Sequence, residues 1–206
     1  IRADKEWEAQ QGFIRAWVAH IFHMKTAGEP FKRLATSGWR PTPAMTEVGN
    51  YPVTIEVPAG PITVGGTRRN ARMVIEYVEG WLGGRGAKGI DSLAGKPGVH
   101  PALMEDLATG RMSVAQIAQR IRHHAKDSTD PSQVHDFPMV KRLLQEEVED
   151  ILRLTTAKER ETEVRYRKAV KIALRWIKNY TELDFRSLGS YTHPDLERIA
   201  TGPDAF

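Results

Sequence analysis

The sequence predicts a mainly α-helical fold, and two patterns carry this prediction. Apolar residues recur at helical spacing in three long stretches after residue 69, and prolines and glycines punctuate residues 36–66. With 206 residues, 40% of them hydrophobic and 27% charged, the chain has the composition of a folded globular protein. Its length allows one large domain or somewhat more than one smaller domain.

The first part of the chain predicts a helix, a strand and a connection. Residues 2–11 are charged and rich in helix formers, and Gly12 is placed to end that helix. Residues 13–21 form a largely apolar run, which predicts a short, mostly buried strand. Residues 36–66 contain five prolines and five glycines, so we expect a loop or an inter-domain crossing, with a brief strand possible at 53–57.

The next stretch predicts an amphipathic helix from about Arg69. Its apolar residues fall on one stripe, and they are Met73, Val74, Tyr77, Val78, Trp81 and Leu82. Gly83 and Gly84 end this helix, and a long glycine-rich loop is expected over 83–98. Ser113 and Gln116 have the spacing of a capping box, which predicts a helix running to about Lys126.

The last third of the chain predicts two long helices after a polar connection at 127–138. Their apolar stripes lie within residues 140–152 and 166–177. The intervening residues are strong helix formers, so one bent helix is the alternative. A final short helix is expected after His193 and Pro194.

Composition excludes several classes of protein. The chain has no cysteine, which removes disulfides, thiolate metal sites and cysteine nucleophiles. No apolar run is long enough to cross a bilayer, so no membrane association is expected. The start lacks both Met and a signal sequence, so we expect a piece of a longer polypeptide, and the cytoplasm is the default location. The net charge of +4 suits an anionic ligand.

Three motif searches give little support for other chemistry. The loop 83–89 follows a helix and Lys88 precedes a glycine, so it is not a nucleotide P-loop, although Arg85 and Lys88 could meet an anionic tail. The histidines lack the spacing of metal ligands, so no residue is assigned to a metal. No Gly-x-Ser-x-Gly supports a serine hydrolase.

The basic runs at 68–72 and 120–126 raise the question of nucleic acid binding. Acidic residues interleave elsewhere, and the aromatic residues lie on apolar stripes where they cannot form stacking platforms. A cationic helix end that interacts with the helix dipole explains the second run. Nucleic acid is therefore disfavoured as a partner.

Glu105 and Asp106 form the most informative pair in the sequence. Either acid could cap the following helix or simply be solvated, and spacing alone favours that interpretation. However, the apolar run 99–104 precedes the pair, and a carboxylate beside apolar side chains is poorly solvated. We therefore expect a raised pKa at Asp106, which would suit a general base.

The segment around this pair resembles malate synthases, in which Leu-Met-Glu-Asp-x-Ala-Thr precedes a Ser and a helix. Residues 103–109 and Ser113 match that motif. Further blocks resemble the family in the same order, and they lie at 2–13, 17–20, 61–63, 69–70 and 76–82. The resemblance covers roughly residues 2–125.

The resemblance implies a TIM barrel followed by a helical domain that caps the barrel mouth. Residues 1–35 would be the partial last α/β unit of the barrel, 36–66 the crossing segment and 67–206 the helical C-terminal domain. The family condenses acetyl-CoA with glyoxylate and hydrolyses the product to malate and CoA. By this resemblance Asp106 is the catalytic base, and Glu105 has a positional role.

The same resemblance places other parts of the family's site outside this chain. A catalytic Arg and the Glu and Asp ligands of a Mg²⁺ ion would lie in upstream barrel strands, so the isolated chain is expected to be inactive. Two alternatives stay open. One is an enzyme that cleaves or hydrolyses malyl-CoA-type thioesters, and the other is a helical interaction or nucleic-acid-binding module with no active site.

Overall fold

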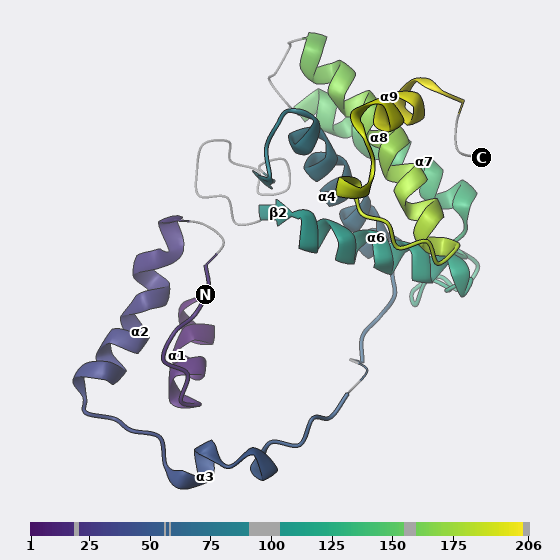
Figure 1. The fold of residues 1–206 in the computed structure, drawn as a ribbon. Helices are drawn as coiled ribbons and strands as arrows, with labels where there is room; N and C mark the ends of the chain where they lie inside the picture. Colours follow the sequence, from purple (N-terminus) through teal and green to yellow (C-terminus); the bar gives the residue numbers. More distant parts are fainter. Residues whose placement is uncertain (19–20, 56, 58, 91–103, 155–159, 204–206) are drawn as a thin grey trace. The chain divides into compact units, whose positions relative to one another are not determined.

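The computed structural model describes residues 1–18, 21–55, 57, 59–90, 104–154 and 160–203. It divides the chain into two compact units, Ile1–Ala59 and Gly60–Phe206 (Figure 1). Within the described residues the fold is mainly helical, which confirms the predicted class. The two units are described separately below.

The first unit is built on two helices, α1 (Arg2–Gln10) and α2 (Met24–Thr36), which pack against each other. Their ion pairs join Arg2 to Glu29 and Arg33 to Glu6, each at 2.9 Å, and their buried residues include Ala9, Ala27, Pro30 and Phe31. Gly12 follows α1 with a φ of +96°, so the helix ends where the sequence predicted. The short helices of the unit are η1 (Ile21–His23), α3 (Pro43–Thr46) and η2 (Val48–Asn50).

The strand predicted over residues 13–21 is wrong for the described residues 13–18, which have no regular secondary structure. The side chain of Trp17 is 96% exposed, so this segment is not buried either. A strand needs neighbouring strands to pair its backbone groups, and the described residues of this unit contain none. For the same reason the possible strand at 53–57 is absent from its described residues, whose valines and isoleucine are exposed.

The second unit is a helical bundle around α4 (Val64–Leu82). Helices α6 (Leu107–Arg122), α7 (Phe137–Leu154) and α8 (Arg160–Thr181) pack against α4, and α9 (His193–Thr201) packs against α8 (Figure 1). The short helix η3 (Leu188–Ser190) precedes α9. The bundle's largest fully buried side chains include Ile75, Tyr77, Ile117, Leu143, Leu144, Ile151, Ile172, Trp176 and Ile177.

Helix α4 begins earlier than the apolar stripe predicted, at Val64 and not near Arg69. Thr63 caps it, because its side-chain oxygen accepts a hydrogen bond from the amide of Gly66. From Val74 to Gly80 every residue of the helix is buried, including two glutamates. A helix buried on all sides is the core of its bundle, and charged residues on it need partners within the fold.

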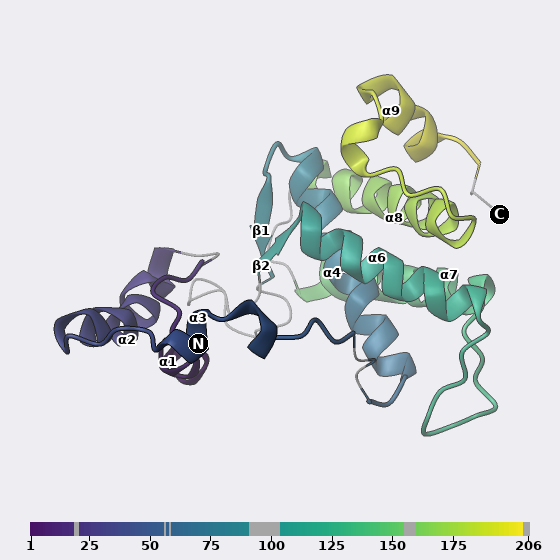
Figure 2. The same ribbon diagram turned by 60° about the horizontal axis from the view of Figure 1, so that its bottom comes forward.

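The predicted end of α4 at Gly83 and Gly84 is confirmed, but part of the expected loop is a strand. Strand β1 (Ala87–Gly89) pairs antiparallel with β2 (Met104–Asp106), and Figure 2 shows the two strands side by side. The register pairs Ala87 with Asp106 and Lys88 with Glu105. The rest of the expected loop, from 91 to 98, lies outside the described residues.

The later helices agree with the sequence apart from one boundary. Helices α7, α8 and α9 are confirmed, while residues 155–159, on which the single bent helix depended, are not among those described. The start predicted at Ser113 is wrong, because α6 begins at Leu107 and Ser113 is buried in its interior. The Ser113–Gln116 spacing therefore does not form the cap.

The connection from α6 to α7 binds back to the start of α4. The amide of Val64 donates to Asp127 Oδ2 at 2.5 Å, and the amide and hydroxyl of Thr129 donate to Oδ1. These bonds hold the pKa of Asp127 far below its ordinary value. His135 is fully buried, with its ring nitrogens 2.8 Å from Thr67 Oγ1 and 2.6 Å from the carbonyl of Ala125. This histidine is satisfied within the core.

Candidate functional site

Asp106 lies at the junction of β2 and α6, where it is both the last residue of the strand and the N-cap of the helix. Its Oδ1 accepts a hydrogen bond from the amide of Thr109 at 2.9 Å, and Thr109 Oγ1 accepts one from the amide of Asp106 at 2.9 Å. This reciprocal pair is a capping box. The interpretation of the acidic pair as a helix cap is thus confirmed, and Asp106 is the capping residue.

The pKa expected for Asp106 is wrong in direction for this chain. The backbone hydrogen bond from Thr109 lowers the pKa of Asp106, partial burial opposes it, and the Thr109 hydroxyl lowers it further. Asp106 is exposed, and not poorly solvated as the sequence predicted; residues 99–103 of the apolar run lie outside the described residues. Asp106 is consequently ionised at neutral pH, which is the state a proton acceptor requires.

Tyr77 on α4 lies behind this junction. Its ring is almost fully buried, and burial first and the charge of Asp106 second raise the pKa of the phenol. One turn into α6, Gly110 faces the same ring: a Cβ built on Gly110 would lie 3.1 Å from Tyr77 Cδ1. Because ordinary carbon contacts begin near 3.5 Å, only glycine allows α6 to approach α4 this closely.

A buried cluster of charges lies where β1 meets α4 and α8. Lys88 Nζ is 2.5 Å from Glu76 Oε2, 2.6 Å from Glu79 Oε2 and 2.8 Å from the Tyr166 hydroxyl. The hydroxyl of Tyr166 donates to Glu76 Oε2 at 2.7 Å. Burial is the main reason that the pKa of this phenol is strongly raised.

Arginines complete the cluster around Glu79. Arg165 Nε donates to Glu79 Oε1 at 2.9 Å, and Arg85 donates to Oε2 at 3.0 Å. Burial alone would raise the pKa of Glu79, but Lys88 and then Arg165 outweigh it, so the pKa is lowered. The sequence suggested that Arg85 and Lys88 could bind an anionic ligand. In the structure both bind carboxylates of their own domain. The pattern that could have shown this is a pair of glutamates, i and i+3, inside an otherwise apolar helix.

The basic runs are also engaged within the bundle. Arg68 contacts Glu146 and Glu147, and Arg72 contacts Glu147 and, at 3.7 Å, Asp150. In the second run Arg120 donates to Thr67 and Arg122 to the carbonyl of Thr181. These partners account for Arg68, Arg72, Arg120 and Arg122, while Arg69 is exposed.

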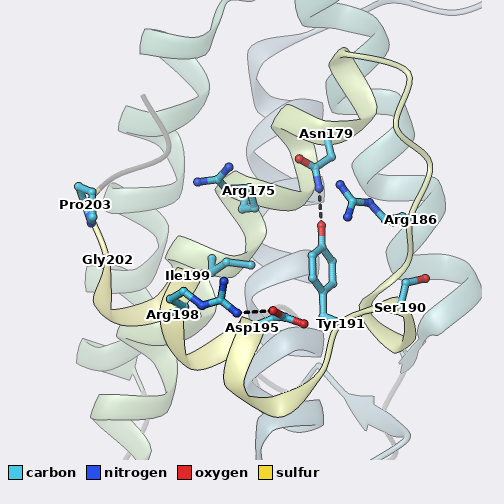
Figure 3. Close-up of a pocket in the computed structure, with 10 residues that line it drawn as sticks. All are labelled: Arg175, Asn179, Arg186, Ser190, Tyr191, Asp195, Arg198, Ile199, Gly202 and Pro203. Carbon is cyan, nitrogen blue, oxygen red and sulfur yellow. Dashed lines mark hydrogen bonds and ion pairs between the residues drawn. The ribbon is translucent and has the colours of Figure 1, made fainter.

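A separate pocket of about 440 Å³ lies between α8, η3 and α9 (Figure 3). Its lining residues are Arg175, Asn179, Arg186, Ser190, Tyr191, Asp195, Arg198, Ile199, Gly202 and Pro203. Two of its three guanidinium groups are paired, Arg186 with Asp184 and Arg198 with Asp195 at 2.6 Å. The lining is cationic, but most of that charge is balanced locally, and no residue of β2 or α6 belongs to it.

The described residues contain no group of three or more His, Asp or Glu side chains that could hold a metal ion. They also contain no helix long and apolar enough to span a membrane. The geometry is therefore that of a helical domain that presents one exposed, ionised carboxylate at a strand–helix junction.

The family model described as "Malate synthase, C-terminal" matches residues 61–193, which is more than half of the chain. The chain belongs to the malate synthase C-terminal domain family. Glyoxysomal malate synthase from Gossypium hirsutum is 29% identical over 199 residues, covering 94% of this chain and 33% of the relative. Malate synthase A from Escherichia coli is 28% identical over 195 residues, covering 93% and 34%. Malate synthase from Streptomyces clavuligerus is 35% identical over 127 residues, covering 59% and 21%.

The match confirms the family that the sequence motifs suggested. The matched residues include Asp106, the β1–β2 pair and most of the bundle. The chain spans about a third of the length of the cotton and Escherichia coli relatives. What the whole protein does is therefore a matter for proposal.

Proposed function

We propose that this chain is the C-terminal portion of a malate synthase, with Asp106 as its general base. The complete enzyme would condense acetyl-CoA with glyoxylate and hydrolyse the product to malate and CoA. The observation that supports this most directly is an exposed, ionised carboxylate at a strand–helix junction within the residues that match the family. A base must be accessible and deprotonated before it can act.

In this proposal Asp106 removes a proton from the methyl group of acetyl-CoA, and the resulting enolate carbon forms a bond to the aldehyde carbon of glyoxylate. Hydrolysis of the thioester then releases CoA. Docking against the rest of the enzyme would exclude water from Asp106 and raise the pKa from its low value in this chain. A carboxylate whose pKa is raised is a stronger base toward the methyl group of acetyl-CoA.

The remaining parts of the site belong to the proposed upstream barrel. Residues 1–35 would contribute its last α/β unit, 36–66 would cross over, and 67–206 would form the helical domain. The exposed segment 13–18 would then find its partner strands in the barrel. The described residues do not offer a Mg²⁺ site, so we assign none here and expect its ligands upstream. We propose a cytoplasmic enzyme, although the cotton relative is named glyoxysomal.

The experiment compares the complete enzyme with its Asp106→Asn variant, by the release of CoA thiol in the presence of acetyl-CoA, glyoxylate and Mg²⁺. Asparagine caps helices as well as aspartate does, so folding and acetyl-CoA binding should be kept while condensation is lost by a factor of at least 10³. Asp130→Asn, at an exposed loop position, is the control and should keep full activity. Condensation that survives in Asp106→Asn would contradict the assignment of the base.

Other outcomes separate the alternatives. Cleavage or hydrolysis of malyl-CoA without synthesis of malate would favour the thioester lyase or thioesterase. A complete protein with no thioester chemistry at all would favour the interaction module. Residues 1–206 alone should form no malate, and turnover by this chain would contradict the upstream location of the missing groups.

A further inference from the structure

The cluster around Lys88 does more than neutralise two buried carboxylates. Strand β1 is short and has a single partner strand among the described residues, so its own backbone bonds fix it weakly. The Lys88 side chain connects β1 to two other elements, because its acceptors Glu76 and Glu79 lie on α4 and Tyr166 lies on α8. The strand is thus attached to the core of the bundle through one ammonium group.

The chemistry of that attachment permits little freedom. An ammonium has three N–H donors, and Glu76, Glu79 and Tyr166 provide an acceptor for each of them. The side chains of both glutamates are only 2% exposed and that of Lys88 is 11% exposed. Because both carboxylates are this deeply buried, displacing Lys88 would remove a cation from them where water compensates poorly for its loss.

The stem of Lys88 is fixed as well as its charge. A Cβ built on Gly80 would lie 3.0 Å from Lys88 Cδ and 3.1 Å from Lys88 Cβ. The aliphatic part of Lys88 therefore lies directly on the bare backbone of α4. Glu76, Glu79 and Gly80 are spaced i, i+3 and i+4 and so lie on one face of α4, which contacts both the stem and the ammonium group of Lys88.

The strand register carries this constraint to the proposed base. Lys88 pairs with Glu105 and the preceding residue, Ala87, pairs with Asp106. On its other side Asp106 starts α6, which Gly110 seats against Tyr77. The backbone of Asp106 thus lies between two contacts with α4: that of Lys88 on β1 with Glu76 and Glu79, and that of Gly110 on α6 with Tyr77.

We propose that Lys88 is a positioning residue for Asp106: the buried Glu76–Glu79–Lys88–Tyr166 cluster fixes the β1–β2 pair and so determines where the base carboxylate stands. This inference rests on the proposed function for the identity of the base. It assigns no contact with substrate to Lys88. Catalysis is sensitive to such placement, because a displacement of about 1 Å can lower a rate by about a hundredfold.

The test uses the complete enzyme and the double variant Lys88→Met with Glu76→Gln. This pair of changes keeps the volumes similar and removes one charge of each sign, and Glu79 keeps its ion pair with Arg165. The matched control is Arg72→Met with Glu147→Gln, a similarly buried pair that joins α4 to α7 and involves neither β1 nor β2. Thermal melting shows that each variant is folded.

Three further readouts distinguish positioning from general stability. Hydrogen exchange should become at least about fivefold faster for peptides covering residues 104–109 in the Lys88 variant only. The kcat should fall about tenfold or more with the KM values for acetyl-CoA and glyoxylate within about twofold. The isotope effect on kcat with trideuterated acetyl-CoA should increase, since proton removal would become more rate-limiting. The control variant should change none of these.

Unchanged exchange over 104–109 in the Lys88 variant would overturn the proposal, as would faster exchange with unchanged kcat and isotope effect in an active enzyme. Equal losses in both double variants would also overturn it, because they would show a structural role only. Failure of the proposed function looks different: the unaltered complete enzyme would form no malate, and the exchange measurement alone would then decide whether Lys88 fixes Asp106.

Discussion

Replacing Gly110 with Ala should destabilise the helical domain, against the usual effect of this substitution in a helix. Gly110 lies in the first turns of α6, where alanine is favoured over glycine by about 1 kcal/mol. The added Cβ would lie 3.1 Å from Tyr77 Cδ1 and 3.6 Å from Cγ and Cε1. Ordinary carbon contacts are about 3.5–4.0 Å, so α6 and the ring must separate by roughly 0.4–0.9 Å.

The ring cannot move away easily, because Tyr77 is only 2% exposed and belongs to the core. Overpacking of this kind costs about 1–3 kcal/mol, which outweighs the gain in helix propensity. We therefore expect a net loss of about 1 kcal/mol in the free energy of unfolding, with an upper bound near 2 kcal/mol. Urea denaturation of residues 1–206, followed by circular dichroism, measures this difference.

The matched control is Gly65→Ala in the first turn of α4. Gly65 is exposed, and the nearest atom to an added Cβ is Thr63 Oγ1 at 4.0 Å, an ordinary contact. Here alanine should stabilise the domain by several tenths of a kcal/mol to about 1 kcal/mol. If Gly110→Ala stabilises the domain as much as Gly65→Ala does, the close approach of α6 to Tyr77 is refuted.

Two further predictions concern charges away from the junction. Arg72→Met should destabilise the bundle by about 2–4 kcal/mol in urea denaturation. The change removes the buried cation of Glu147, a largely buried carboxylate that keeps the partly exposed Arg68. Adding Glu147→Gln should recover most of that loss, and a double variant as unstable as the single one would contradict the reasoning. The pKa of Asp127 in the folded state lies far below its unfolded value near 3.9. Asp127 therefore stabilises the fold fully above the unfolded pKa, and this contribution is lost progressively as the pH falls below it. Asp127→Asn should therefore flatten the decline in stability between about pH 5 and 3, and an unchanged slope in that window would exclude Asp127 as its source.

The sequence was most informative where hydrophobic periodicity was long. The stripes of α4, α7 and α8 each cover several turns, so burial of one face predicts the helix without knowledge of its neighbours. The family resemblance, which the comparisons confirm, came from short motifs in a fixed order. Asp106 was chosen as the site residue by that resemblance, and its catalytic role stays a prediction.

The errors have two other physical origins: one strand lacks partners distant in the sequence, and a local cap that the apolar pattern does not show explains the rest. The apolar run 13–18 could become a strand only beside other strands, and the described part of the first unit provides none. Ser113 and Gln116 have capping spacing, but Asp106 and Thr109 start the helix two turns earlier. The lowered pKa of Asp106 follows from that cap, which the apolar residues before it did not reveal.

The capping box at Asp106 restricts which amino acid can serve at this position. A side chain that caps its own helix must be short enough for its oxygen to turn back to the amide of Thr109, and aspartate reaches it at 2.9 Å. Glutamate has the same charge and a similar intrinsic acidity, but its extra methylene carries the carboxylate past the amide, and it is not a preferred capping residue. The two acids that chemistry would regard as interchangeable bases are therefore not interchangeable here, because the first turn of α6 selects the shorter one.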